Sequence, residues 1–235
     1  MLKKAIPKSW MTRANIFHAA LRLLSKQEIE DITVRSIAKE AGIGVGSFYY
    51  YYKTKFDVFY DAYSFMDNYF ENVVASSLPD GSAWDQLIYY FDQYHYYNIE
   101  RTPFKLYKLI VLHASAAHLQ SATYGYFRVL CSIVHNGQKQ GTISQKESPE
   151  DIALFLISGM RSIYRHWMLL DGAYDIETGY RTTAVKLLSV YMQPPKGYID
   201  YRVAEQEGGQ KGFVSHADEE TVPIGQIIPG RKASY

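Results

Sequence analysis

The side chains best suited to a recognisable chemistry lie in residues 33–55, which read TVRSIAKEAGIGVGSFYYYYKTK. Tyr49 and Tyr50 carry phenolic hydroxyls that can reach phosphate oxygens and rings that can touch thymine methyl groups. These residue types, close together in the chain, suit the recognition of double-stranded DNA.

Two short helices are expected to position these side chains. Gly42 falls where the first helix must end and the chain must turn, and Thr33 is a suitable N-cap with Ser36 three residues on. Apolar residues recur at the three- and four-residue spacing of a helix, namely Val34, Ile37, Ala38, Ala41 and Ile43. The pattern predicts a helix-turn-helix, in which the second helix enters a major groove and the first braces it. A preceding amphipathic helix over residues 10–26 is expected to pack beneath both.

The tyrosine run at the end of the second helix has two interpretations. Phe48 and Tyr52 are four residues apart and are expected to fill the small core, whereas Tyr49, Tyr50 and Tyr51 cannot all point inward. The exposed rings are either aromatic residues at a helix end without a function, or contacts to DNA backbone and bases.

Charge supports the second interpretation only modestly. Residues 1–60 carry ten Lys and Arg against five Asp and Glu, a net charge of +5, whereas residues 61–235 carry fifteen against nineteen, a net charge of −4. A basic surface supplies the salt-sensitive part of DNA affinity, although an excess of this size also suits an ordinary solvated surface.

Composition limits the other classes of protein to which the chain could belong. A chain of 235 residues that is 47% apolar can bury one or two cores. No apolar run approaches the roughly 20 residues needed to cross a bilayer, and the first ten residues lack the apolar region of a signal peptide, so a cytoplasmic protein without a membrane partner is expected. The single Cys131 excludes an internal disulfide.

No pattern in the sequence indicates catalysis. There is no Gly-x-Ser-x-Gly elbow, no phosphate-binding glycine loop and no HExxH, and His113 and His118 are five residues apart, which does not place them on one helical face. We therefore expect no catalytic residue, no metal site and no cofactor.

The segment from about Arg13 to Tyr60 resembles the N-terminal domain of the TetR family of bacterial transcriptional repressors. The resemblance rests on a glycine turn, a recognition helix, an aromatic residue at its end and a Lys-x-Lys pair. Those positions are Ala38, Ala41, Gly42 and Ile43; Gly46, Ser47, Phe48 and Tyr49; Tyr52; and Lys53 and Lys55.

The resemblance implies contacts residue by residue. Base edges would be met by Arg35, Val45, Gly46 and Ser47, phosphates by Thr33, Tyr49 and Lys55, and a base or sugar by Tyr50. Gly44 and Val45 replace the polar residues usual at the turn, so specificity is expected to depend also on DNA shape.

The rest of the chain is also expected to be helical. A helix of about 20 residues starts near Thr54, and further helices are expected at residues 82–99, 103–118, 122–140, 149–170 and 176–192. The predicted fold is all-α: a three-helix DNA-binding domain (residues 1–56), a long connecting helix, and a helical effector-binding and dimerisation domain (57–193). In the resembling family the connecting helix acts as a lever; the alternative is a plain packing helix.

Residues 84–97 are unusually aromatic. They predict either a helix buried on most of its circumference or the lining of a pocket for an apolar or aromatic ligand. The candidate ligand-binding residues are Tyr90, Phe91, Tyr94, Tyr97, Tyr107, Leu112, Tyr126 and Phe127.

The last two long helices carry wide apolar stripes, which suit a core plus a partner. The resemblance implies a homodimer built from these helices, with Gly159 allowing close approach. The candidate interface residues are Ile152, Phe155, Gly159, Ile163, Trp167, Leu187 and Tyr191. A two-fold dimer predicts a palindromic operator.

Residues 194–235 contain ten Pro and Gly residues, and an irregular extension without an assigned function is expected. The sequence as a whole predicts a DNA-binding transcriptional repressor whose operator affinity is controlled by a small hydrophobic or aromatic effector. The alternatives are a helical ligand-binding or interaction protein without sequence-specific DNA binding and, third, an enzyme.

Overall fold

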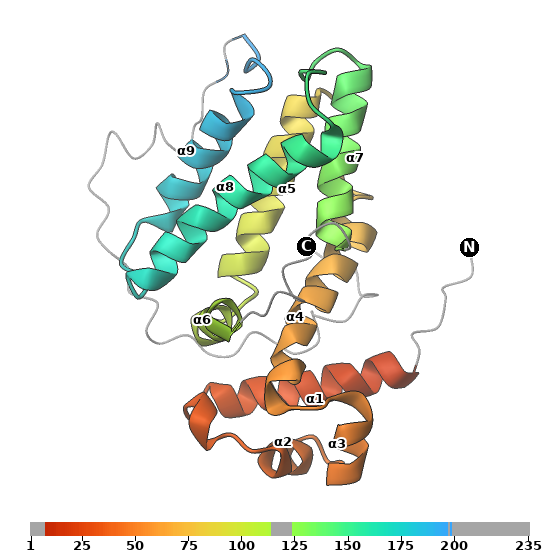
Figure 1. Cartoon of the computed structure of the whole chain (residues 1–235), viewed down its shortest axis with the longest axis vertical. Helices are drawn as coiled ribbons and strands as arrows, with labels where there is room; N and C mark the ends of the chain where they lie inside the picture. Colours follow the sequence, from red (N-terminus) through yellow and green to blue (C-terminus); the bar gives the residue numbers. More distant parts are fainter. Residues whose placement is uncertain (1–7, 114–123, 197, 199–235) are drawn as a thin grey trace, which may run out of the picture. The chain divides into compact units, whose positions relative to one another are not determined.

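The structure is a computed structural model that describes residues 8–113, 124–196 and 198. Within them every regular element is helical, as predicted (Figure 1). The helices are α1 (Lys8–Leu24), α2 (Val34–Glu40), α3 (Val45–Tyr51), α4 (Lys55–Tyr69), α5 (Ala83–Ile99), α6 (Phe104–His113), α7 (Gly125–Lys139), α8 (Pro149–Leu169) and α9 (Ile176–Leu188).

The predicted helices agree with these bounds to within a few residues. The predicted ends at residues 118 and 122 lie outside the described residues, as does nearly all of the predicted extension after residue 193. The long helix from residue 54 does not stay regular: α4 ends at Tyr69, and a π-helical turn, Phe70–Val74, follows, with the N–H of Ala75 donating to the carbonyl of Phe70 at 2.9 Å. A π turn widens a helix locally and is frequent at functional sites.

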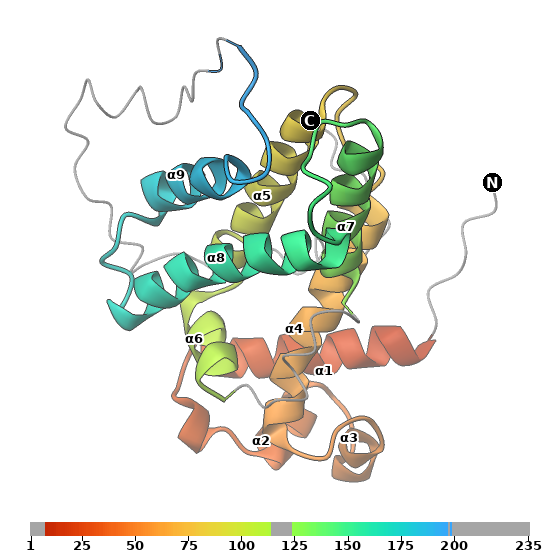
Figure 2. The same cartoon turned by 45° about the horizontal axis from the view of Figure 1, so that its top comes forward.

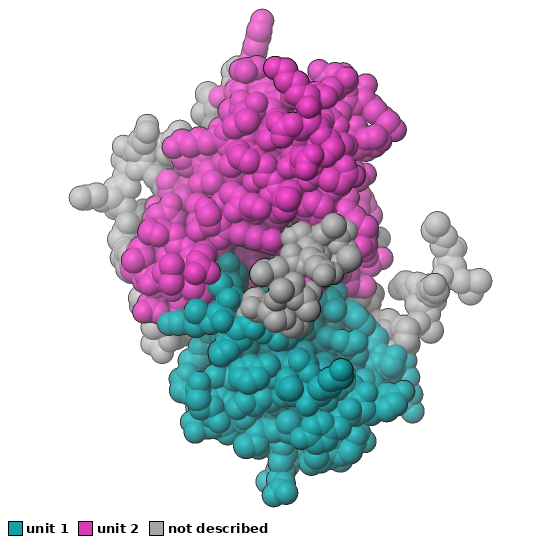
Figure 3. Space-filling view, in the orientation of Figure 1, with its two compact units in different colours: residues 1–65, 105–114, 223–235 teal, residues 66–104, 115–222 magenta. Residues whose placement is uncertain are grey.

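The chain divides into two compact units (Figure 3). The described part of unit 1 comprises residues 8–65 and 105–113, and that of unit 2 comprises residues 66–104, 124–196 and 198. The division falls within α4, after Phe65, rather than at a loop. The predicted domain limits at residues 56 and 193 stay predictions.

The core of unit 1 lies where α1, α2 and α3 meet. Ile16 of α1, Ile37 of α2 and Phe48 of α3 are completely buried. Val58 and Phe59 close the core from the first turns of α4, and Leu106, Leu109 and Ile110 of α6 belong to the same cluster. Burying a side chain of this size stabilises the fold by about 1.5–3 kcal/mol, so this core determines where α3 sits.

Unit 2 is a layered arrangement of α5, α7, α8 and α9 (Figure 2). Helix α8 packs against both α7 and α9, and α5 also contacts α7 and α9. Three helix starts are capped by side chains, since Ser82, Ser148 and Asp175 accept from the N–H groups of Asp85, Asp151 and Thr178. Among the described residues, no helix is both long and apolar enough to cross a membrane.

Two residues of the predicted dimer stripe are used inside the protomer. Ile152 is completely buried, so it cannot meet a partner. Gly159 faces Leu187 of the same chain, so its small size serves the packing of α8 on α9. The assignment of Ile152 to an interface was wrong, because helical periodicity identifies an apolar face but not what covers it. Gly159 is half-buried, and its role at an interface stays a prediction.

The other five predicted interface residues have mixed environments. Phe155 is 42% exposed and meets the ring of Tyr191 edge-on, with ring centroids 5.5 Å apart. Trp167 meets Phe104 at 4.8 Å, and Ile163 and Leu187 are half-buried. The role of these five residues at an interface stays a prediction.

Candidate nucleic-acid interface

The turn between α2 and α3 is built on Gly42. Its φ of +68° lies in the left-handed region, which costs glycine nothing. The N–H of Gly42 donates to the carbonyl of Lys39 at 3.1 Å, and the N–H of Ile43 donates to that of Ala38 at 2.9 Å. This pair of bonds is a Schellman motif, which ends α2 and redirects the chain into α3.

The start of α2 is fixed by a reciprocal cap. The hydroxyl of Thr33 accepts from the N–H of Ser36, and the hydroxyl of Ser36 accepts from the N–H of Thr33, both at 3.0 Å. The predicted N-cap is therefore confirmed. Thr33 is itself exposed, so its hydroxyl proton is still available to an outside acceptor.

Helix α3 has one buried and one exposed face. Phe48 is completely buried and Tyr52 is 4% exposed, which confirms that they fill the core. Tyr49 is 56% exposed and Tyr50 81% exposed. Val45, Gly46 and Ser47 are also exposed, so the predicted base-reading residues share the solvent face with these two tyrosines.

Arg35 lies exposed on α2 and forms no ion pair within the described part of the chain. Its helix is braced from behind by α1. The amide of Asn15 donates to the carbonyl of Ala41 at 2.8 Å, and Arg22 pairs with Glu40 at 2.7 Å. The guanidinium of Arg35 is thus carried on a held helix and is free to bind an acceptor.

Lys55 differs from the other predicted contacts. It is half-buried, and its ammonium donates to the carbonyls of Ile29 at 2.6 Å and Ile32 at 2.8 Å. These bonds tie α4 to the short 3₁₀ turn Ile29–Asp31 before α2. The side chain therefore has a structural partner that the sequence did not indicate, and its contact with phosphate stays a prediction.

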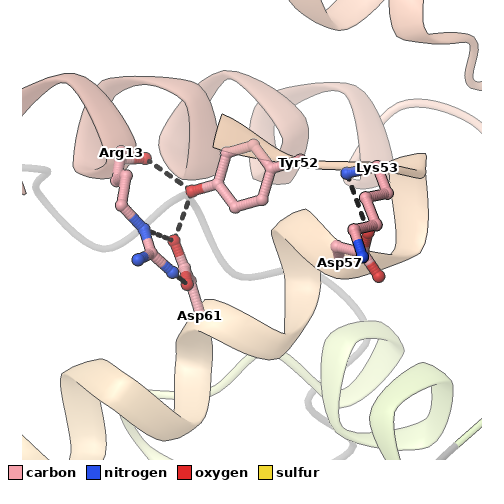
Figure 4. A network of polar contacts seen from close by, with 5 residues as sticks. All are labelled: Arg13, Tyr52, Lys53, Asp57 and Asp61. Carbon is pink, nitrogen blue, oxygen red and sulfur yellow. Dashed lines mark hydrogen bonds and ion pairs between the residues drawn. The ribbon is translucent and has the colours of Figure 1, made fainter. Parts of the chain in front are cut away.

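The start of α4 is capped by its own carboxylate. Asp57 accepts from the N–H group of Lys53 at 3.0 Å (Figure 4) and from the N–H group of Thr54 at 2.8 Å. A carboxylate in the first turn also interacts favourably with the helix dipole. The connection between α3 and α4 is thereby held to a single short turn.

A polar network around the buried Asp61 links three helices of unit 1 (Figure 4). Arg13 of α1 forms a two-pronged ion pair with Asp61 of α4, and its Nε donates at 3.0 Å. The hydroxyl of Tyr52 donates to the same carboxylate. The hydrogen bond with Asp61 raises the pKa of Arg13, and burial, followed by the charge of Asp61, raises the pKa of Tyr52, so the phenol keeps its proton.

Sequence reasoning missed this network. One available signal was Asp61 itself, a carboxylate within the otherwise apolar stripe of Val58, Ala62 and Phe65. A buried carboxylate requires donors, but the sequence does not say that they come from residues 48 and 9 positions away.

The aromatic residues of unit 2 form a packed cluster around Phe70, the first residue of the π turn. Its ring lies 5.0 Å from that of Tyr90 and 6.2 Å from that of Tyr126. The hydroxyl of Tyr90 donates to the carbonyl of Tyr126 at 2.9 Å, and Tyr94 lies 6.2 Å from Tyr126. The structure thus brings three predicted ligand residues together.

The other predicted ligand residues are distributed differently. Phe91 and Phe127 are buried, and Tyr97 meets Tyr69 at 5.4 Å. Tyr107 and Leu112 lie on α6 in unit 1, where Leu112 is 57% exposed. The ligand-binding set stays a prediction. Among the described residues, no group of three His, Cys, Asp or Glu side chains could hold a metal ion.

Two helices joined by a Schellman turn, the second with an exposed polar and aromatic face, define unit 1 as a helix-turn-helix unit. Residues 16–61 match the family described as bacterial regulatory proteins, tetR family. The match covers the N-terminal helix-turn-helix segment, where the residues of the turn and of the recognition helix carry the predicted resemblance. Among curated proteins, the sequence has no match.

Solved structures share the fold at low sequence identity. FadR from Bacillus subtilis, in complex with stearoyl-CoA, has a TM-score of 0.61 at 19% identity and covers 74% of this chain and 97% of its own. FadR from Thermus thermophilus, in complex with lauroyl-CoA, has a TM-score of 0.60 at 20% identity, covering 76% and 92%. SmeT, the repressor of a Stenotrophomonas maltophilia multidrug efflux pump, has a TM-score of 0.57 at 15% identity, covering 81% and 95%.

Proposed function

We propose that the protein is a DNA-binding transcriptional repressor whose operator affinity is controlled by a small hydrophobic or aromatic effector. The observation that carries the proposal is the surface of the helix-turn-helix. Seven of the eight predicted DNA contacts, all except Lys55, are exposed on or beside α2 and α3. Their helices are held by a core and by caps, so the side chains are presented on a rigid scaffold.

Two kinds of contact are distinguished on this surface. Arg35 supplies a two-pronged donor suited to guanine, and Val45 an apolar contact for a thymine methyl group. Thr33, Tyr49 and Tyr50 supply hydroxyls for phosphates and sugars, which position the protein without reading sequence. Because polar side chains are few at the start of α3, we infer that part of the specificity comes from DNA shape.

The nature of the effector is inferred from chemistry and from the relatives. The cluster of Tyr90, Tyr94 and Tyr126 offers flat apolar faces with single hydroxyls, which suit an apolar or aromatic molecule. The two FadR proteins were solved with stearoyl-CoA and with lauroyl-CoA, and SmeT also with triclosan. We propose a ligand of comparable apolar character in unit 2.

A homodimer is part of the proposal. The exposed apolar side chains of α8, Leu154 and Phe155, are 47% and 42% exposed, and side chains of this kind on one helix suit a partner surface. A two-fold dimer would present two copies of α3 about one DNA turn apart, which requires a palindromic operator.

The test is a footprint on the DNA that flanks the protein's own gene, repeated over a range of salt concentrations. We expect one protected palindrome and an affinity that falls steeply with salt, because neutralised phosphates release counterions. If no palindrome is protected, or the affinity is independent of salt, the repressor function is wrong. A helical ligand-binding or interaction protein would then be the better description.

A further inference from the structure

Asp61 occupies a junction of unit 1. It lies on α4 and is buried, 3% exposed, where α1 and the end of α3 meet that helix. Its carboxylate is surrounded by donors from both neighbours, Arg13 of α1 and Tyr52 at the end of α3 (Figure 4). One side chain therefore joins the three helices that carry or brace the proposed DNA-binding surface.

The contact with Tyr52 acts directly on α3. Tyr52 is the C-cap of α3, and its N–H donates to the carbonyl of Phe48 at 3.0 Å. Its ring lies 5.6 Å from that of Phe48 and 5.6 Å from the guanidinium carbon of Arg13. A displacement of the Tyr52 ring thus requires a displacement of the last turn of α3.

The polar chemistry of this junction allows only one relative position of α1, α3 and α4. An apolar contact can slide with little loss, whereas a buried carboxylate is satisfied only where its donors are aligned. A two-pronged pair with arginine adds direction, because both N–H groups must meet both oxygens. A rotation of α4, or a shift of α3, would leave the Asp61 charge buried without its donors, which is strongly unfavourable.

We infer that Asp61 is a positioning residue for DNA recognition, which holds α3 in its operator-binding orientation through Tyr52 and Arg13. The inference rests on the proposed function and deepens it. It names the side chains that fix the position of the recognition helix relative to the first half of α4.

The test compares Tyr52→Phe with Tyr51→Phe. The first variant keeps the buried ring and removes only the hydroxyl that meets Asp61. The second removes a hydroxyl from the adjacent residue of the same tyrosine run, where the ring packs on that of Tyr52 at 6.5 Å and lies outside the network. Dissociation constants are measured for the protected palindrome and for unrelated DNA, at a temperature where circular dichroism shows both variants fully folded.

For Tyr52→Phe we expect the operator affinity to fall about tenfold, as for the loss of one hydrogen bond to a charged group. Affinity for unrelated DNA and its salt dependence should stay within about twofold, because no phosphate-binding charge is removed. Tyr51→Phe should change the ratio of the two affinities by less than about twofold. Asp61→Asn should weaken operator binding further, and adding Tyr52→Phe to it should have little additional effect, since both changes act on one network.

The inference is overturned if Tyr52→Phe lowers the melting temperature but leaves the operator affinity unchanged. It is also overturned if both affinities fall together, since the network would then be an ordinary part of the core. If the wild-type protein protects no palindrome, the proposed function fails, and hydrogen exchange of the α3 amides still tests the junction. Faster exchange in Tyr52→Phe than in Tyr51→Phe supports it, and equal exchange rejects it.

Discussion

Leu187 of α9 packs directly over Gly159 of α8, where a Cβ added to Gly159 would lie 2.6 Å from the Leu187 Cδ1 atom. A similar close approach occurs at Gly137 of α7, but there the neighbours include the Cβ of Ala83 at 2.9 Å, which is fixed to its backbone. Leu187 presents only the flexible end of its side chain. The two glycines thus differ in how easily their neighbours can yield.

Gly137→Ala and Gly159→Ala should therefore differ in stability. Both gain about 1 kcal/mol of helix propensity. At Gly159 a rotation of Leu187 relieves the clash, and we expect a net change within about 1 kcal/mol. At Gly137 helix α5 must shift, and overpacking should destabilise the protein by about 1–3 kcal/mol. Urea unfolding measures both, and equal losses would contradict this difference.

Arg35→Ala tests direct readout. The structure leaves the guanidinium exposed and without an ion pair in the described part of the chain. We expect a loss of about 1–3 kcal/mol at the operator and relaxed discrimination at one base pair, because a two-pronged guanine contact is removed. Binding to a set of operators, each altered at one position, measures the effect. A uniform loss on all of them would mean that Arg35 contacts phosphate instead.

Lys55→Met should lower stability as well as any DNA affinity. Its ammonium binds the carbonyls of Ile29 and Ile32, which would lose their donor, at a cost of about 1 kcal/mol. Lys53→Met is the matched control, because Lys53 is exposed and two residues away. Thermal unfolding should separate the two variants. If the two variants have the same melting temperature, the hydrogen bonds from Lys55 to the 3₁₀ turn make no measurable contribution to stability.

Asp67 should make stability depend on pH. Burial raises the pKa of its carboxyl from 3.8 to about 6, although the N–H groups of Tyr126 and Gly125 oppose the shift. A raised pKa means that the folded protein binds this proton more tightly. The bound proton therefore stabilises the folded state fully below pH 3.8, and this stabilisation is lost as the pH rises through about 6.

Asp67→Asn isolates this dependence, because asparagine stays neutral and can still accept from the N–H of Tyr126. We expect the two proteins to melt at similar temperatures near pH 4, whereas at pH 7.5 the variant should melt about 2–4 °C higher, allowing for partial solvent screening. Melting curves across this range measure the difference. A constant difference at all pH values would show that Asp67 does not titrate there.

Phe155→Asp tests the proposed dimer. A charge in the centre of an apolar contact is costly to bury, so we expect a monomer at concentrations where the wild-type protein is a dimer. Val73→Asp is the control, since Val73 has a similar exposure, 41%, but lies on the π turn rather than on α8. Sedimentation equilibrium distinguishes the two. If the Phe155→Asp variant is still a dimer, the dimer interface does not include Phe155, and this prediction is wrong.

The local features of unit 1 could be predicted from the sequence because they depend on neighbours in the chain. The stop at Gly42 needs only a residue that tolerates a positive φ, and the cap at Thr33 needs only a hydroxyl three residues before Ser36. The burial of Phe48 and the exposure of Tyr50 follow from helical spacing. The all-helical class follows in the same way from periodicity and breakers.

Tertiary structure alone decided which side chains meet across the chain. Arg13 and Asp61 are 48 residues apart, and Lys55 reaches a carbonyl 26 residues earlier. Gly159 and Ile152 lie on an apolar stripe of α8. The spacing of its residues does not reveal whether α9 or a partner subunit covers that stripe. Periodicity fixes the direction of a side chain relative to its own helix, whereas its partner depends on how the helices pack. The residues of the proposed DNA-binding surface and their local caps could therefore be found in the sequence, whereas the polar contacts that join distant helices beneath that surface could not.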